Sequence, residues 1–520
     1  MGFESILDLK EPVKGMTRPV FFQDLNIDQI VERVVRGDRR LNDYYEYFPL
    51  DAECEQYRRL VYRDIRKNGL GDALSKFCEI YRQFRENEEK KKGTRIQLQK
   101  PIWHFCGICL YADALLGLKD ILKDTKLESE GFSELLKYLE EYTSDKDFVR
   151  MSTTAAELKK ALDSLKVTVI YENNRVYVYI DDKKTSEGEG AEDKADTSDE
   201  DEEEQYAVYE EFLKFFMEDN EKTFVNPFAA VSELTSFEQE IAKIVTKKDP
   251  ELFKKADKIY SEFGVYEDPV FSRLADELPF YLAFNSFEEE MEKKGFKFSE
   301  PVVDENERFM AKGLYDLALA CVNAEKGKPV ISNEFYYDAD DLFFVLTGPN
   351  QGGKTTFARS LGQLVYFTKI GLNVAADSAN LHYFKDILTH FSVEESVETG
   401  RGKLMEELVR LSPMMKSKQT GAFIVINELF TTAANYDAII MGKNVLSHFI
   451  NEGCYGIYVT HLRELCDVDK RVVGLSAQLD ENGIQNFKIL RKEVQYKACA
   501  ENQINKYRLG YQQLKERLGI

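Results

Sequence analysis

Residues 348–355 combine glycines, a lysine and a hydroxyl side chain at a spacing that suits a phosphate group. Glycines let backbone N–H groups turn inward around phosphate oxygens, and a helix that begins there adds its positive end. Lys354 can reach the β- and γ-phosphates of a nucleotide, and the Thr355 hydroxyl can bind Mg²⁺. The apolar run before the loop and the helical pattern after it favour this interpretation over a plain glycine turn. The run that fits G-x-x-x-x-G-K-[ST] is Gly348, Pro349, Asn350, Gln351, Gly352, Gly353, Lys354 and Thr355, followed by Thr356.

Two other apolar runs end in polar residues that suit a nucleoside triphosphatase. The run AFIVINEL places Asn427 and Glu428 at the end of an expected strand, and GIYVTHLREL does the same for His461. Glu428 can polarise an attacking water, and His461 can contact the γ-phosphate or serve a structural role. Asn427 stands where an aspartate usually holds the metal. Because Asn427 brings no charge, we expect hydrolysis to be slow or demanding of metal.

The spacing of apolar residues along the chain changes near residue 300. Residues 26–165 and 206–294 place apolar residues three and four apart, which is typical of helices. Residues 167–180 alternate around Asn173-Asn174, which predicts a β-hairpin. Beyond residue 300, apolar β-rich runs alternate with helical ones, which predicts an α/β fold with a parallel sheet. We therefore expect a helical region over 1–300, an α/β domain over 301–500 and a C-terminal helix over 501–520.

Composition limits the cellular setting. The chain has 520 residues, 43% of them hydrophobic, without an apolar run long enough for a membrane helix. The N-terminus lacks the pattern of a signal peptide, and eight scattered cysteines indicate a reducing cytoplasm. The net charge is -22, and residues 183–205 hold eleven acidic residues against three lysines. We expect that segment to be disordered. Proteins that grip DNA usually cluster Lys and Arg, so any DNA contact here must be local.

Three motifs together resemble the ATPase domain of the MutS family. They are TGPNQGGKTT, the stretch from Asn427 to Ala438 that begins NEL, and VTHLREL. The resemblance implies a P-loop NTPase domain with an ABC/MutS-like parallel sheet, preceded by a mainly α-helical core and lever region. It also implies ATP and Mg²⁺ as cofactors and a homodimer as the assembly. An N-terminal mismatch-recognition domain is not expected, because about 25 residues precede the first helical pattern.

The resemblance assigns roles to further residues. The stretch HFSVEESVETGRGKLMEELVRL occupies the place of a family signature whose serine contacts the γ-phosphate of the partner. Here that stretch contains Gly400, Arg401 and Gly402, with Gly402 at the serine position and Glu407 at a later acidic position. A solvated helix start is the alternative interpretation. Upstream, PVISNEFYYD resembles the segment beside the adenine. There Asn333 is expected to bind the base and Phe335 to stack on it, with core packing as the alternative for Phe335.

Two functions remain open at this level. The first is a MutS-like, dimeric ATPase switch with Glu428, His461 and Lys354 as catalytic residues and Thr355 and Asn427 at the metal. It would act on DNA by structure rather than base sequence, in mismatch repair or recombination. The alternative is an ATP-gated module that holds a protein and does not touch DNA. Cys106 and Cys109, with His104 nearby, are expected to be core residues of a buried helix, since a second C-x-x-C is absent from the sequence.

Overall fold

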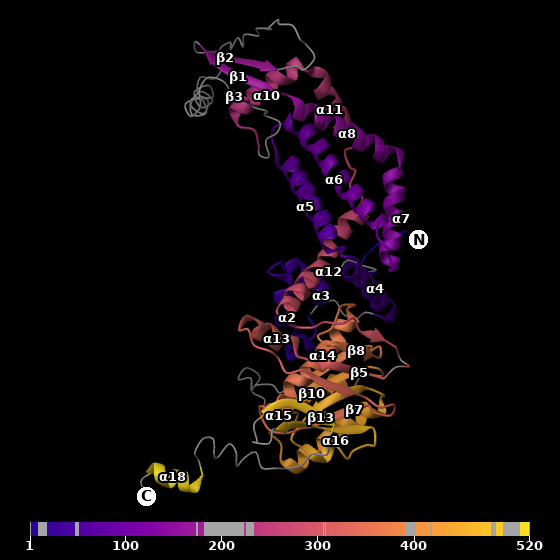
Figure 1. The fold of residues 1–520 in the computed structure, drawn as a ribbon, viewed down its shortest axis with the longest axis vertical. Coiled ribbons are helices and arrows are strands. Elements are labelled where there is room, and N and C mark those ends of the chain that lie inside the picture. The colour runs from indigo at the N-terminus through magenta and orange to yellow at the C-terminus, as the bar shows by residue number, and fades with distance from the viewer. Residues whose placement is uncertain are drawn as a thin grey trace. The chain divides into compact units, whose positions relative to one another are not determined.

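The computed structural model divides the chain into two compact units, whose elements are labelled in Figure 1. Unit 1 comprises residues 1–3, 72–127 and 132–276, and unit 2 comprises residues 4–71, 128–131 and 277–520. Among the described residues, no helix combines the length and the apolar character that crossing a membrane requires. The described residues are 2–8, 18–46, 51–172, 175–180, 223–224, 233–304, 306, 308–391, 402–416, 419–479, 485–491 and 510–518.

Unit 1 is mainly helical, and its helix α6 (Gln99–Lys123) is buried on most of its surface. Apolar residues occupy nearly every face of α6, which is typical of a helix enclosed by others. It packs against α8 and α11. The other helices here are α5 (Gly71–Gly93), α7 (Glu130–Ser144), α8 (Lys146–Ser164), α10 (Ser236–Lys248), α11 (Pro250–Glu262) and the first part of α12 (Pro269–Lys293).

Unit 1 also contains the β-hairpin that the alternating pattern predicts. Strand β1 (Val167–Glu172) pairs antiparallel with β2 (Arg175–Ile180), and β3 (Thr223–Phe224) pairs with the other edge of β1. The expected turn at Asn173-Asn174 and the acidic segment 183–205 lie outside the described residues. Their conformations therefore stay predictions.

Unit 2 contains a six-stranded sheet in the order β13-β12-β7-β11-β10-β9. Neighbouring strands run parallel, except that β13 is antiparallel to β12. Strands β7 and β10 are buried at every residue, as expected of parallel strands covered on both faces. The strands are β7 (Phe343–Thr347), β9 (Ile387–Phe391), β10 (Phe423–Asn427), β11 (Tyr455–Val459), β12 (Val472–Leu479) and β13 (Gln485–Arg491).

A second sheet and several helices complete unit 2. The second sheet has the order β4-β8-β5-β6 and mixes parallel and antiparallel pairs. Its strands are β4 (Val302–Val303), β5 (Met310–Leu314), β6 (Asn333–Tyr336) and β8 (Ser378–Leu381). The helices are α1 (Phe21–Asp24), α2 (Ile27–Val35), η1 (Arg39–Leu41), α3 (Asn42–Glu46), α4 (Ala52–Asn68), the second part of α12, α13 (Leu317–Glu325), α14 (Lys354–Lys369), α15 (Lys403–Lys416), α16 (Asn435–Asn451), η2 (Arg463–Leu465) and α18 (Tyr511–Leu518).

Helix α14 lies at the junction of these elements and explains why the units differ from the division expected at residue 300. It packs against β10 and β11, and its buried side chains also bind the N-terminal helices. The hydroxyl of Tyr366 donates to the carbonyl of Tyr45 at 2.7 Å, and the Gln363 amide donates to the carbonyl of Leu25 at 2.8 Å. Residues 4–71 therefore belong with the large sheet. Contacts between segments so distant in sequence leave no trace in local periodicity.

Candidate functional site

The glycine-rich loop joins the end of β7 to the start of α14. Gly348 has a φ angle of 136°, and a Cβ atom there would lie 2.8 Å from the Cβ of Ala477, so a side chain would clash. Gly353 precedes the helix with a φ angle of 83°, which side chains disfavour. The loop is thereby held at the N-terminus of α14, where N–H groups without helical partners and the helix dipole favour an anion.

The side chain of Lys354 folds back over this loop. Its ammonium donates to the carbonyl oxygens of Gly348 at 2.8 Å and of Pro349 at 3.1 Å. The residue is only 4% exposed. A positive charge is therefore held beside the turn, and phosphate oxygens at that place would be acceptors for the same ammonium.

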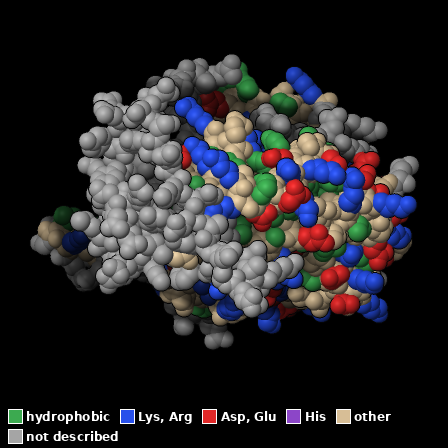
Figure 2. All heavy atoms as spheres, turned by 90° about the horizontal axis from the view of Figure 1, so that it is seen from above, with side chains coloured by type: hydrophobic (Ala, Val, Ile, Leu, Met, Phe, Trp, Pro, Cys, Tyr) green, Lys and Arg blue, Asp and Glu red, His purple; other side chains and the backbone are tan. Residues whose placement is uncertain are grey.

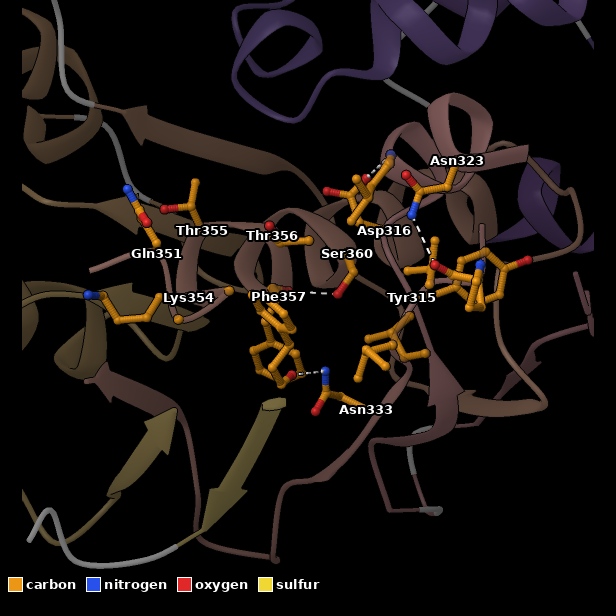
Figure 3. A pocket seen from close by; sticks show the side chains of 18 of the residues that line it. Tyr315, Asp316, Asn323, Asn333, Gln351, Lys354, Thr355, Thr356, Phe357 and Ser360 are labelled. Atoms are coloured by element: carbon orange, nitrogen blue, oxygen red, sulfur yellow. Dashed lines mark hydrogen bonds between the residues drawn. The ribbon is translucent and has the colours of Figure 1, made fainter. Parts of the chain in front are cut away.

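A cavity of about 470 Å³ opens beside the loop, a size typical of small-molecule sites. Figure 3 shows Gln351, Lys354 and Thr355 at one end and Tyr315 and Asn323 at the other. Residues of the loop therefore line one part of the cavity, and residues from other segments line the rest. Its lining is Leu314, Tyr315, Asp316, Leu319, Asn323, Pro329, Val330, Ile331, Asn333, Asn350, Gln351, Gly352, Gly353, Lys354, Thr355, Thr356, Phe357, Ser360, Glu428 and Phe487.

The two residues expected at a metal are in direct contact. The hydroxyl of Thr355, on the first turn of α14, donates to the side-chain oxygen of Asn427 at 2.9 Å. Asn427 is the last residue of β10 and is 8% exposed. Both side chains present oxygen atoms, the ligand type that Mg²⁺ prefers. Neither oxygen carries a formal negative charge.

Glu428 follows Asn427 and lines the cavity. The Oε1 atom of Glu428 lies 3.6 Å from the Nε2 atom of His461, which follows β11. The contact with His461, assisted by the charge of Lys354, lowers the pKa of the Glu428 carboxyl despite its partial burial. Glu428 is therefore ionised near neutral pH and can accept a hydrogen bond or a proton.

The chain around Glu428 is strained. Glu428 and Phe430 have φ angles of 54° and 64°, values at which a left-handed backbone costs about 1–2 kcal/mol per residue. The backbone N–H of Glu428 donates to the carbonyl of Val459 at 2.9 Å, which joins the ends of β10 and β11. Such strain persists where the surroundings fix it, and it is frequent at active sites.

Asn333 and Phe335 occupy different environments although both lie on β6. Asn333 lines the cavity and binds β13, since its amide donates to the carbonyl of Phe487 at 3.2 Å and its oxygen accepts from the N–H of Ile489 at 2.8 Å. Phe335 is 5% exposed and is absent from the cavity lining. Core packing, the alternative for Phe335, is the environment that the structure shows. Its aromatic neighbours are Phe309, Tyr337, Phe344 and Phe357.

Other residues supply an apolar lining of the cavity, and sequence reasoning missed them. Val330 and Ile331 precede β6, and Phe487 reaches the cavity from β13. Ile331 and Phe487 are 45% and 44% exposed, so each leaves apolar surface uncovered. Phe487 lies far from the loop in sequence, but a Cβ atom on Gly353 would be 3.4 Å from its ring. The pattern around Phe487 in the sequence gives no signal of this proximity.

The comparisons with known proteins agree with the motifs. Residues 344–504 match the family model "MutS domain V". The DNA mismatch repair protein MutS of Streptococcus mutans is 29% identical over 162 residues, which is 30% of this chain and 19% of that protein. The same protein of Fervidobacterium nodosum is 24% identical over 247 residues, or 47% and 29% of the two chains.

Residues 344–504 are thus a MutS-family domain. A eukaryotic relative is DNA mismatch repair protein msh-2 of Neurospora crassa, 30% identical over 147 residues, which is 28% of this chain and 16% of that protein. The chain thus spans less than a third of the length of the curated relatives it matches. Domain V contains the loop at residue 348, the pair Asn427-Glu428 and His461.

The expected signature of the MutS family is only partly covered by the structure. Gly400 and Arg401 lie outside the described residues, so their expected role in binding the nucleotide stays a prediction. Gly402 is exposed just before α15, where its carbonyl accepts from the N–H of Met405 at 2.9 Å. Gly402 does not line the cavity. Lys403, the next residue, contributes to lowering the pKa of Glu428.

The C-x-x-C pair of unit 1 is separate from this chemistry. Burial raises the pKa of Cys106 to about 11 and that of Cys109 to about 12, so both are thiols at neutral pH. His104 is buried against Tyr260 and Tyr266. Within the described ranges, no group of three or more His, Cys, Asp or Glu side chains could hold a metal ion.

Proposed function

We propose that this MutS-family chain binds ATP with Mg²⁺ in the cavity beside residues 348–355 and hydrolyses it. The observation that carries the proposal is that Lys354, Thr355 and Glu428 line one cavity, while Thr355 also contacts Asn427. The parallel strand neighbours of β7, β10 and β11 support a P-loop NTPase fold of the MutS type, because ligands of such sheets bind at the carboxyl ends of the strands.

In this proposal the triphosphate lies along the N-terminus of α14. Backbone N–H groups of the loop and the Lys354 ammonium bind the phosphate oxygens. Thr355 and Asn427 hold Mg²⁺, and their 2.9 Å contact fits a pair of neutral oxygen ligands. A bound Mg²⁺ would neutralise phosphate charge. The lack of a carboxylate at Asn427 favours weak metal binding and slow turnover.

Glu428 is the residue we assign to the attacking water. Its lowered pKa keeps the carboxylate charged, so it can orient a water by accepting a hydrogen bond from it. His461 contacts this carboxylate at 3.6 Å and would link its position to the γ-phosphate. The adenine would lie against the apolar lining formed by Phe487 and Ile331, with Asn333 at its edge.

A second copy of the chain is the partner that the surface of unit 2 supports. Helices α15 and α16 share one apolar core, yet both also expose apolar side chains. A dimer formed over these helices would cover that surface. The exposed residues are Met405, Leu408 and Val409 on α15 and Tyr436 and Ile440 on α16.

DNA is the cargo we propose for this dimeric switch, since the curated relatives are named as DNA mismatch repair proteins. ATP binding would favour a closed dimer, and hydrolysis would reset it. The alternative, an ATP-gated module for a protein partner in the cytoplasm, is favoured by the net charge of -22. In Figure 2, the described Lys and Arg side chains of the face in view are interspersed with Asp and Glu.

Nucleotide protection and a salt series test these proposals. ATP with Mg²⁺ should raise the melting temperature of the chain, and the purified chain should release phosphate from ATP. Absence of both effects would refute the ATPase proposal. Duplex and branched DNA should then bind at about 50 mM salt with a log–log salt slope clearly below zero. A chain that hydrolyses ATP but does not bind either DNA under these conditions would favour the protein-binding alternative.

A further inference from the structure

The loop after β10 needs a support that its own sequence does not supply. Glu428 and Phe430 both adopt left-handed backbone angles, of 54° and 64°, although neither is a glycine. Residues other than glycine keep such angles only where surrounding contacts determine them. Since Glu428 lines the cavity, the contact that fixes this loop also fixes the carboxylate there.

Glu407 on α15 makes that contact. Its Oε2 atom accepts a hydrogen bond from the backbone N–H of Phe430 at 3.1 Å. The side chain of Glu407 is fully buried, and burial raises the pKa of its carboxyl. Its Oε1 atom and the nearby hydroxyl of Tyr458 are both buried, and neither has a hydrogen-bond partner among the described residues. A carboxyl group buried with so few partners lowers stability, so a role in positioning explains it better than a role in folding.

The backbone of Glu407 is itself fixed to the large sheet. The imidazole of His390, on β9, donates through Nε2 to the carbonyl of Glu407 at 3.2 Å. One turn later, Arg410 donates to the carbonyl of Phe391 at 3.4 Å and pairs with Asp24. Glu407 therefore connects helix α15, which is fixed to β9, with the strained loop that follows β10.

We propose that Glu407 is a positioning residue, which acts on hydrolysis by holding the loop that carries Glu428. This inference rests on the proposed ATPase function. It also gives α15 a means to act on Glu428, because a displacement of the helix would move the acceptor of the Phe430 N–H. Nucleotide binding itself does not depend on this contact, since Glu407 is absent from the cavity lining.

Substitutions of Glu407 in the full chain separate positioning from folding. Glu407→Met keeps the length of the side chain and removes both oxygens, and Glu407→Ala removes the side chain. Glu407→Gln keeps an oxygen for the Phe430 N–H. Glu406→Ala removes the neighbouring carboxylate as a matched control. For each variant we would measure the Kd of a fluorescent ATP analogue and the rate of ATP hydrolysis in a single turnover.

The expected result is a selective loss of the chemical step. Glu407→Met and Glu407→Ala should slow single-turnover hydrolysis by about 10²-fold, as misplaced catalytic groups do. Their Kd should change less than about threefold, and Glu407→Gln and Glu406→Ala should hydrolyse at nearly the parental rate. If Glu407→Ala fails to fold, Glu407→Met alone decides, because its volume is retained.

Two outcomes would overturn this inference. Hydrolysis at the parental rate in Glu407→Met would show that the contact is dispensable. Equal losses of affinity and rate, without recovery in Glu407→Gln, would show a merely structural role. A parental chain that neither binds nor hydrolyses ATP would instead refute the proposed function, which distinguishes the two failures.

Discussion

The proposed phosphate end of the cavity and the cavity's apolar lining are built in different ways. The proposed phosphate end comes from one continuous run, residues 348–355, and from residues at the ends of two neighbouring strands, Asn427-Glu428 at β10 and His461 beyond β11. The apolar lining comes from Ile331, before β6, and from Phe487, which lies beside Gly353 but belongs to an antiparallel edge strand. The phosphate end therefore depends on one loop and on strands that end at one edge of the sheet, whereas the apolar lining depends on the meeting of segments that have no such pattern.

Removing the proposed catalytic carboxylate should have the largest effect at the phosphate end. Glu428→Gln keeps the shape of the side chain but removes its charge, so hydrolysis should fall by about 10²–10⁴-fold while ATP still binds. Phosphate release under saturating ATP is the measurement, and Glu464→Gln, at an exposed site just beyond His461, is the control. Parental turnover in Glu428→Gln would assign the base to another residue.

Loss of the Lys354 ammonium should weaken ATP binding and not only slow hydrolysis. Lys354→Ala removes the charged donor beside the loop, and hydrogen bonds to charged groups contribute about 1.5–3 kcal/mol, so the Kd for ATP should rise by about 10–100-fold. Thermal protection of the chain by ATP and Mg²⁺ should fall accordingly. Undiminished protection in Lys354→Ala would mean that nucleotide binds elsewhere.

Substitutions of Phe487 and Phe335 test which of these phenylalanines contacts the nucleotide. Phe487→Ala should raise the Kd for ATP by about tenfold, since aromatic–base stacking is worth about 1–3 kcal/mol, without lowering the melting temperature much. Phe335→Ala should instead destabilise the fold by about 3–5 kcal/mol, because Phe335 is buried in the core.

The two variants serve as controls for each other. Melting curves and ATP titrations of both variants are the measurements. Weaker ATP binding in Phe335→Ala at an unchanged melting temperature, with unchanged ATP binding in Phe487→Ala, would contradict this assignment.

Those parts of the site that depend on residue spacing and on the ends of strands could be predicted from the sequence. The loop, the Thr355–Asn427 contact and the position of Glu428 beside the cavity all follow from strands that end at one edge of a parallel sheet. Side chains alternate along β6, so Asn333 and Phe335 lie on the same buried face of the strand. They nevertheless contact different neighbours. Periodicity alone did not distinguish a cavity from a core.

The remainder was set by contacts between distant parts of the chain. Gly362 on α14 leaves room for Leu25, and a Cβ atom there would lie 2.6 Å from the Leu25 side chain. That close approach joins the N-terminal helices to the sheet. In the sequence, a glycine inside a helical pattern can have many other causes, so it does not predict this contact. Glu407 is similar, because its hydrogen bond to the Phe430 N–H joins two elements that sequence alone does not pair.

Asn427 offers the smallest and most specific change at the phosphate end. Asn427→Asp adds one charge beside the Thr355 hydroxyl, so Mg²⁺ should bind about fivefold more tightly, since one partly solvated charge contributes about 1 kcal/mol. ATP hydrolysis titrated with Mg²⁺ should shift its midpoint to lower concentration. Asn435→Asp, at an exposed position of the same unit, adds the same charge and should leave the midpoint unchanged. An unchanged midpoint in Asn427→Asp would place the metal away from β10, and slow turnover would then need a cause other than the missing carboxylate.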